Sequence, residues 1–226
     1  MILRNYPKTR VGFVAMALAL SGCAAHESSP GTGAASPGPG DASVPEMQRI
    51  RGEVLVGKDG YGLTPCGSDQ QRILTLSQQA GAFLDEFMQP GDKLEFFMDA
   101  WGREKDGKLE IIAVERAHTE GPRCDASREG AQFVVSGTEP FWSLQLSPSG
   151  WLLQRPDHPP LQVAAVPTKI GAGYLWTSTS PKATVEITPA YCADAMADAA
   201  SAWQAKISLD DLRLTGCAHR GELPLP

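Results

Sequence analysis

The chain has 226 residues, with 26 acidic against 20 basic side chains and a formal net charge of −6 at pH 7. Binding to a phosphate backbone needs clustered Lys and Arg, and this acidic chain has no such block, so we exclude a nucleic-acid partner. Its hydrophobic content of 42% is enough for a packed core, and its length allows one large or two small domains.

Residues 1–22 have the pattern of a secretory signal peptide. They contain three basic and no acidic residues, followed by the ten-residue apolar run 11–20. A permanent transmembrane helix needs about 20 apolar residues to cross a hydrocarbon core of about 30 Å, so this run is too short to span a bilayer. The small residues Ser21 and Gly22 then precede Cys23.

The segment Leu20-Ser21-Gly22-Cys23 resembles the bacterial lipobox, whose cysteine is acylated and becomes the first residue of the mature protein. The resemblance implies a lipoprotein of the bacterial cell envelope, attached to the membrane through lipid on Cys23. Ala24 implies the outer membrane, with the protein facing the periplasm. The alternative is an ordinary signal peptide with a cysteine near its cleavage site. Loss of residues 1–22 takes three positive charges from −6 and leaves −9.

Residues 23–45 are expected to be the lipidated cysteine and a flexible tether. In the stretch 24–45, 17 of the 22 residues are Ala, Gly, Pro or Ser, which leaves almost nothing to bury. Such a tether holds the folded part away from the membrane surface.

Residues 46–124 predict a small β-rich domain with one helix. Apolar patterning predicts four strands, at 50–56, 72–76, 94–98 and 109–114. Residues 58–62 read as a turn cluster and 65–67 as a loop. Ser77 is a candidate helix N-cap, the apolar residues of 80–88 have helical spacing, and Pro90-Gly91 ends the helix. The order β-β-α-β-β predicts an OB-like barrel or sheet with one covering helix.

Residues 131–220, after the polar linker 125–130, predict an antiparallel β domain, either a barrel or a sandwich. Seven or eight short strands are expected, from the segments 133–135, 141–146, 151–154, 161–166, 174–177, 184–187, 203–209 and 212–217. The Ala-rich stretch between Cys192 and Trp203 is expected to form a short helical turn. The whole chain therefore belongs to a mainly β, β-rich α+β class.

The cysteine count fits an oxidising compartment. If Cys23 carries lipid, four cysteines remain and three pairings are possible. We favour Cys66–Cys124 and Cys192–Cys217, because each pair then lies within one predicted domain. No Cys-x-x-Cys or Cys/His ligand spacing occurs, so we predict neither a metal site nor a cofactor.

Three segments of the predicted second domain suggest a family. They are Gly137-Thr138-Glu139-Pro140-Phe141-Trp142, Cys192-Ala193-Asp194-Ala195-Met196 and Leu214-Thr215-Gly216-Cys217-Ala218. Together they resemble an uncharacterised bacterial envelope lipoprotein family with G-x-E-P-F-W, C-x-D-x-M and L-x-G-C-A segments, loosely associated with META-domain proteins. This chain departs from that pattern at Ala197, where the resemblance leads us to expect Ser.

Glu139, Phe141 and Trp142 are the candidate binding residues. Glu139 beside an aromatic platform at a barrel mouth would suit a ligand or partner. We favour a structural role, in which Pro140 sets the start of a strand, Trp142 fills the core and Glu139 accepts backbone hydrogen bonds. Trp151, Trp176 and Trp203 are also expected in the core or at its rim.

Two further features invite functional interpretations that we do not favour. A Cys-x-Asp-x-Met run could hold copper, but no second Met or His cluster accompanies it, so Met196 is expected in the core. His118, His158 and His219 are expected at the surface.

The catalytic signatures of hydrolases, metalloproteases and nucleotide-binding enzymes are missing from the sequence, so we do not predict an enzyme. We expect a binding or structural module that recognises an envelope protein, a glycan or a small molecule. One alternative is a carrier or sensor of an apolar ligand in the C-terminal barrel. Another is an inhibitor of a hydrolase such as lysozyme, by analogy of fold.

Overall fold

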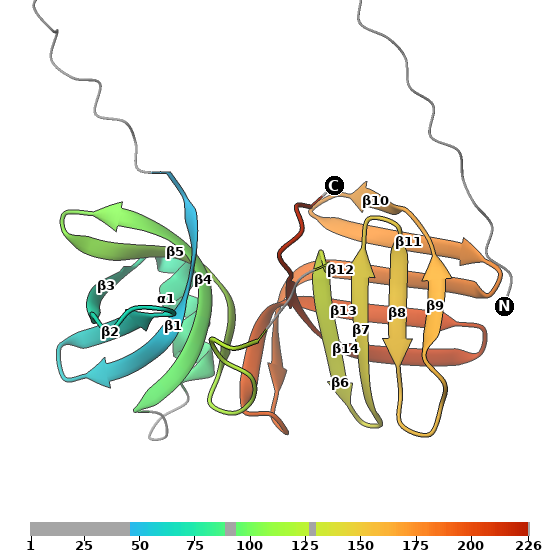
Figure 1. Cartoon of the computed structure of the whole chain (residues 1–226), viewed down its shortest axis with the longest axis horizontal. Helices are drawn as coiled ribbons and strands as arrows, with labels where there is room; N and C mark the ends of the chain where they lie inside the picture. The colour runs from blue at the N-terminus through green and yellow to red at the C-terminus, as the bar shows by residue number, and fades with distance from the viewer. Residues whose placement is uncertain (1–45, 89–93, 127–129, 226) are drawn as a thin grey trace, which may run out of the picture. The chain divides into compact units, whose positions relative to one another are not determined.

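The computed structural model describes residues 46–88, 94–126 and 130–225 (Figure 1). These residues are mainly β, with a single helix among them, as the patterning predicts. No helix in these ranges is long and apolar enough to cross a membrane. Cys23 and the predicted signal peptide and tether lie outside the described residues.

Residues 48–118 form a five-stranded barrel with one helix. Its elements are β1 (Gln48–Gly57), β2 (Gly60–Pro65), β3 (Arg72–Leu76), α1 (Gln78–Phe87), β4 (Glu95–Lys105) and β5 (Lys108–His118). Neighbouring strands follow the order β3-β2-β1-β4-β5, and a parallel pairing of β3 with β5 closes the barrel. The helix lies between β3 and β4 in the chain. This is the topology of an OB fold, which confirms the predicted OB-like barrel.

Strand β2 is the element of the barrel that the sequence patterning misses. The expected turn cluster and loop are instead a two-residue turn, at Lys58 and Asp59, followed by a strand paired with β1. Glycine has low strand propensity, so Gly60 and Gly62 hide the strand from a propensity argument. A Cβ at Gly62 would lie 2.7 Å from the Gln71 side chain, so Gln71 fills the space where a larger residue would sit.

Helix α1 begins as the sequence predicts. The Ser77 hydroxyl accepts a hydrogen bond from the backbone N–H of Ala80 at 3.1 Å, which satisfies one of the donors exposed at a helix start. Ala80, Leu84 and Phe87 are buried against the barrel. The helix ends at Phe87, and the predicted stop at Pro90-Gly91 lies outside the described residues.

Residues 133–220 form the predicted antiparallel domain. Its strands are β6 (Phe133–Thr138), β7 (Phe141–Ser147), β8 (Gly150–Gln154), β9 (Leu161–Ala164), β10 (Pro167–Ile170), β11 (Gly173–Thr179), β12 (Lys182–Asp194), β13 (Ala199–Leu209) and β14 (Leu212–Arg220). Figure 1 shows β6 to β9 lying across β11 to β14, and β14 pairs with β6 to join the two layers. Strand β10 was not predicted as a separate element.

The expected helical turn near Cys192 is wrong. Strand β12 continues to Asp194 past an irregularity between Pro189 and Cys192, and β13 already begins at Ala199. Ala199 and Ala200 pair with β12 on one side and with β5 on the other. This double pairing holds both residues in the sheet and overrides their helix propensity.

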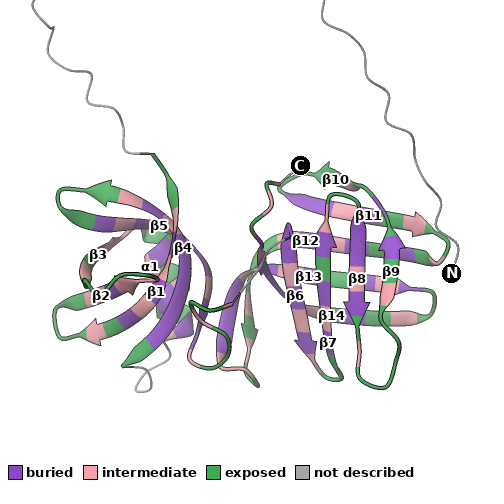
Figure 2. Cartoon of the chain, viewed as in Figure 1, coloured by how far each residue is buried: buried purple, intermediate pink, exposed green. Residues whose placement is uncertain are grey.

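Two hydrophobic clusters, one in each half, make up the core (Figure 2). The cluster in the β6 to β14 half contains the four tryptophans that were expected in a core or at its rim. Trp142, Trp151, Trp176 and Trp203 are 1%, 2%, 0% and 6% exposed, respectively. Strand β13 pairs with β5, so the strands of the two halves belong to one continuous sheet, although the predicted linker separates the halves in sequence.

Both favoured disulfides are present. Cys66 is bonded to Cys124 and Cys192 to Cys217, so each bridge lies within one of the two halves.

Candidate functional site

The three motif segments converge on one open depression of about 540 Å³, which we call the motif pocket. It is lined by residues 136–139, 192–196 and 215–217 together with Gln204. Strand pairing explains the convergence, because Cys217 of β14 lies opposite both Ser136 of β6 and Gln204 of β13. The Cys192–Cys217 disulfide then holds the end of β12 against them.

Trp142 lies beneath this pocket as a structural residue. A Cβ on Gly137 would lie 2.3 Å from the Trp142 Nε1 atom, and a Cβ on Gly216 would lie 2.8 Å from its Cζ2 atom. Two of the motif glycines therefore make room for the indole ring. Trp142 is 1% exposed, so it fills the core, as favoured, and does not offer its face to a ligand.

The other two candidate binding residues are at the surface. Glu139 and Pro140 form the turn between β6 and β7, joined by a cis peptide bond, and Glu139 is exposed. The expected backbone hydrogen bonds to Glu139 are not seen among the described residues. Phe141 is 58% exposed. Of the candidates, only Glu139 therefore lines the pocket.

Met196 corrects another expectation. It is 73% exposed on the pocket rim rather than in the core. The Asp194 carboxylate accepts a hydrogen bond from the Met196 backbone N–H at 3.2 Å. This bond forms a local Asx turn, and Met196 lies in the turn between β12 and β13 rather than in a strand that faces the core.

The chemistry of the motif pocket is polar and acidic. Glu139 and Asp194 carry carboxylates, three residues carry hydroxyls, and Gln204 carries an amide. No Lys, Arg or His lines the pocket. Such a surface suits a cationic group with hydrogen-bonding neighbours, since carboxylates form their strongest hydrogen bonds with charged donors.

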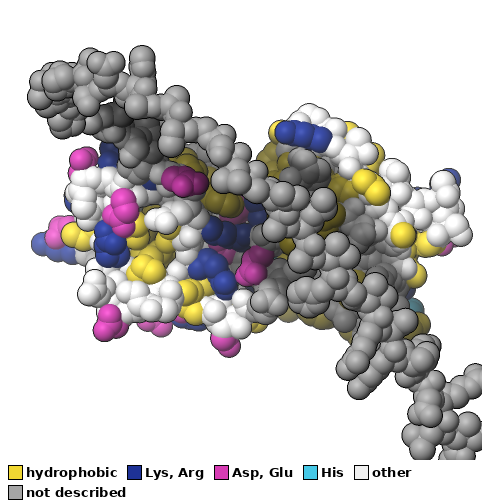
Figure 3. Space-filling model, turned by 45° about the horizontal axis from the view of Figure 1, so that its top comes forward, with side chains coloured by type: hydrophobic (Ala, Val, Ile, Leu, Met, Phe, Trp, Pro, Cys, Tyr) yellow, Lys and Arg dark blue, Asp and Glu magenta, His cyan; other side chains and the backbone are white. Residues whose placement is uncertain are grey.

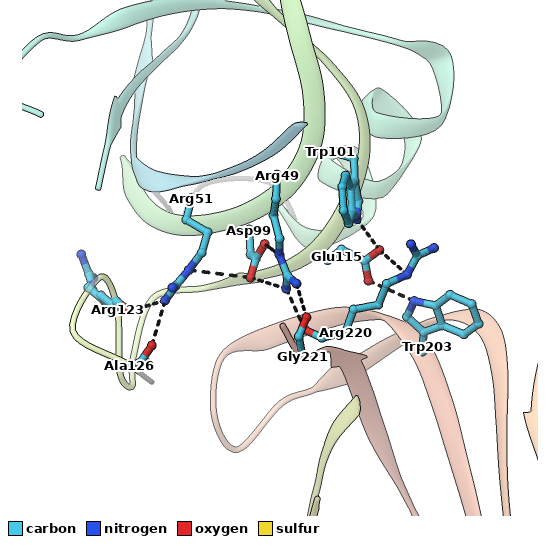
Figure 4. A network of polar contacts seen from close by, with 10 residues as sticks. All are labelled: Arg49, Arg51, Asp99, Trp101, Glu115, Arg123, Ala126, Trp203, Arg220 and Gly221. Carbon is cyan, nitrogen blue, oxygen red and sulfur yellow. Dashed lines mark hydrogen bonds and ion pairs between the residues drawn. The ribbon is translucent and has the colours of Figure 1, made fainter. Parts of the chain in front are cut away.

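A second polar cluster, which the sequence analysis missed, joins the barrel to β13 and β14 (Figure 4). The Glu115 carboxylate, 3% exposed, accepts hydrogen bonds from the indole N–H groups of Trp101 and Trp203, each at 3.0 Å. The Nε atom of Arg220 lies 3.0 Å from the same carboxylate. We call these four residues the Glu115 cluster.

Arg49 and Asp99 lie beside the Glu115 cluster. Arg49 donates to both oxygens of the fully buried Asp99 carboxylate, at 2.7 and 2.9 Å. It also donates to the backbone carbonyls of Arg220 and Gly221. Every carboxylate in this region is matched by a cation from another strand, which is typical of a structural network.

Of the three histidines expected at the surface, two are buried. His118 is fully buried and lies against Phe97, with ring centroids 5.2 Å apart, and His219 is 6% exposed. His118 opposes Ala199 where β5 meets β13, and this long-range pairing buries it. His158 is exposed, as predicted. Within residues 46–88, 94–126 and 130–225, no group of three or more His, Cys, Asp or Glu side chains could hold a metal ion.

No protein-family model, curated protein or solved structure matches this chain.

Proposed function

We propose that this chain is an outer-membrane lipoprotein, acylated on Cys23, whose folded part is a non-enzymatic binding module. Its resemblance to a family of envelope lipoproteins and its signal-like residues 1–22 support the address. The two disulfides fit an oxidising compartment. The tether 24–45 would place the binding module in the periplasm.

The observation that carries the binding role is the convergence of three motif segments on one acidic pocket. Segments that are up to about 80 residues apart line a space of about 540 Å³, which falls within the usual range of ligand sites. Two carboxylates face this space without a basic neighbour in the lining. A cationic group on an envelope protein or glycan is the chemistry that this lining matches.

The same lining argues against catalysis. Its two cysteines are joined as a disulfide, and none of its residues is a histidine or lysine that could activate a hydroxyl nucleophile. The interior of the β6 to β14 half is filled by aromatic and aliphatic side chains. That packing leaves the surface as the binding region and speaks against a carrier with its ligand inside the barrel.

The anchor is tested by metabolic labelling of the full chain with a tagged fatty acid. We expect wild type to take up the label and fractionate with outer membranes, and Cys23→Ala to lose the label. A wild-type chain without label, or a Cys23→Ala variant that keeps it, would refute the lipoprotein proposal.

The pocket is tested by titrating the full chain with trilysine, and with trilysine acetylated on its side chains as the neutral control. The double variant Glu139→Gln/Asp194→Asn removes one exposed and one half-buried carboxylate. It should weaken trilysine binding about tenfold, since a carboxylate near the surface contributes up to about 1 kcal/mol to an ion pair. The matched control Glu120→Gln/Asp157→Asn removes two exposed carboxylates outside the pocket. Equal losses in both variants would show that only net charge matters.

A further inference from the structure

The motif pocket has two chemically different sides. Strands β6, β13 and β14 supply a polar side, which carries three hydroxyls and one amide, from Ser136, Thr138, Thr215 and Gln204. Residues 192–196, at the end of β12 and in the turn after it, supply the other side. Apart from Asp194, this side is apolar, with two alanines, the Met196 thioether and the disulfide of Cys192. A matching ligand therefore has one face of hydrogen-bonding groups and one face of C–H groups.

Each side also carries one carboxylate. Glu139 directly follows β6 on the polar side, and Asp194 is the last residue of β12 on the apolar side. Glu139 is exposed and Asp194 is half-buried, so a ligand can reach both from the solvent. A charged donor forms a hydrogen bond with a carboxylate that is roughly twice as strong as a neutral one. The cationic group of the ligand is therefore expected where these two residues meet the pocket.

An exposed aromatic ring lies beside the pocket. Phe141 of β7 is directly opposite Thr138 of β6 in the strand register. Directly opposite residues have their side chains on the same face of a sheet, with Cβ atoms about 4.5–5.5 Å apart. Phe141 does not line the pocket itself, but it is next to a residue that does, and it is 58% exposed. Its ring offers a flat apolar surface to a second unit of a longer ligand.

We propose that the motif pocket binds an amino sugar with a free amine, as one unit of an envelope glycan, and that the next sugar stacks on Phe141. This inference rests on the proposed function, because it names the ligand of the same pocket. The protonated amine donates to Glu139 and Asp194. The sugar hydroxyls pair with the polar side, and the C–H face of the ring lies on the apolar side.

An amino sugar fits these features better than a basic side chain of a protein. A lysine or arginine side chain has only N–H donors and no hydroxyl. It would use the two carboxylates and leave most of the polar side unmatched. A single basic side chain would also give Phe141 no part in binding. An amino sugar in a glycan combines a cation, hydroxyls, an apolar ring face and a neighbouring ring.

The test is calorimetric titration of the full chain at a mildly acidic pH, where the amine of the sugar is protonated. The probe is a glucosamine trimer, whose net charge equals that of trilysine with free ends. The controls are trilysine and the same trimer acetylated on every amine. We expect the glucosamine trimer to bind at least threefold more tightly than trilysine, and acetylation to weaken it at least tenfold.

Two variants separate the sugar contacts from the charge contacts. Thr215→Val keeps the shape of an exposed strand residue but removes its hydroxyl, and it should weaken the glucosamine trimer at least threefold and leave trilysine unchanged. Phe141→Ala should weaken the trimer at least threefold and leave glucosamine itself unchanged. Thr184→Val, at an exposed position of β12 outside the pocket, is the matched control and should change neither.

Trilysine reports on the proposed function, and the trimer and the two variants report on this inference. If trilysine binds and the glucosamine trimer binds no more tightly, or if Thr215→Val weakens both equally, the pocket recognises a cation alone. The sugar assignment then falls and the proposed function stands. If the wild-type chain binds neither compound, both proposals fall. Equal binding of the acetylated trimer would overturn the role of the free amine.

Discussion

The Glu115 cluster gives the sharpest prediction, and we consider the substitution Glu115→Gln. Glutamine keeps the shape and one acceptor oxygen but replaces the other oxygen with an NH2 group. One of the two indole N–H groups, from Trp101 or Trp203, then faces a donor. The ion pair with Arg220 is lost as well.

The magnitude follows from these contacts. A hydrogen bond to a charged group is worth about 1.5–3 kcal/mol, and breaking a fully buried ion pair costs about 3–5 kcal/mol. The Arg220 side chain is 33% exposed, so water can partly solvate its guanidinium once the pair is broken. We therefore expect Glu115→Gln to lower the free energy of unfolding by about 2–4 kcal/mol.

The assay is urea unfolding followed by far-UV circular dichroism, because two tryptophans of the cluster would distort a fluorescence signal. The matched control is Glu104→Gln, which removes the carboxylate of an ion pair with Arg72 whose side chains are 33% and 46% exposed. Exposed pairs contribute at most about 1 kcal/mol. If Glu115→Gln costs no more than Glu104→Gln, the buried cluster does not stabilise the fold as we argue.

Two further predictions concern Gly137 of the G-x-E-P-F-W segment and Tyr191 of β12. Gly137→Ala should lower the free energy of unfolding by about 1–3 kcal/mol, because its Cβ would overlap the buried Trp142 ring. The control Gly81→Ala lies in α1, where no atom comes within 4 Å of the added Cβ. It should raise the free energy of unfolding by about 0.5–1 kcal/mol in the same urea assay. Glu86→Gln should lower the pKa of Tyr191 towards 10.0 in an NMR titration of labelled tyrosine, while burial still holds it above that value.

The sign of the tyrosine effect on stability follows from the direction of the shift. A raised pKa in the folded chain means that folding favours the neutral phenol, so this stabilisation is complete below pH 10 and disappears as the pH rises through the folded pKa. Tyr61 is the internal control, because burial and then Asp85 raise its pKa. Glu86→Gln should leave Tyr61 unchanged and Asp85→Asn should lower it. The reverse pattern would contradict the assignment.

Local signals in the sequence predicted the elements whose stability is local. Ser77 caps α1 as expected, and the favoured disulfides follow from the order of the cysteines along two separate segments. The OB-like barrel follows from the placement of one helix between short strands. These features depend on residues close together in the chain or on simple order.

Long-range pairing accounts for most of the corrections. Ala199 and His118 are far apart in sequence, yet they pair where β13 meets β5, and His118 is buried there. The same holds for Glu115, whose partners Trp101, Trp203 and Arg220 come from three strands. No local period encodes such contacts, whereas strand β2 was missed for the local reason of its glycines.

The sequence predicted some residues of the candidate site but not their arrangement. Resemblance singled out Glu139 and the segments around Cys192 and Cys217, but their convergence on one pocket required the strand order. Trp142 was assigned to the core correctly, and Met196 was not. A groove between α1 and β12 had no sequence signal, because its aromatic walls come from Phe83 and Tyr191, which are distant in the chain.

The position of β13 and β14 in the sheet has a consequence for synthesis. These strands are the last two that the structure describes, yet they lie in the middle of the strand order, between β5 and β6. Until they are made, the edges of β5 and β6 that they cover stay open, and open edges template aggregation. A chain cut short before Ala199 would keep both edges exposed, so premature termination is more hazardous here than in a protein whose last strand lies at a margin.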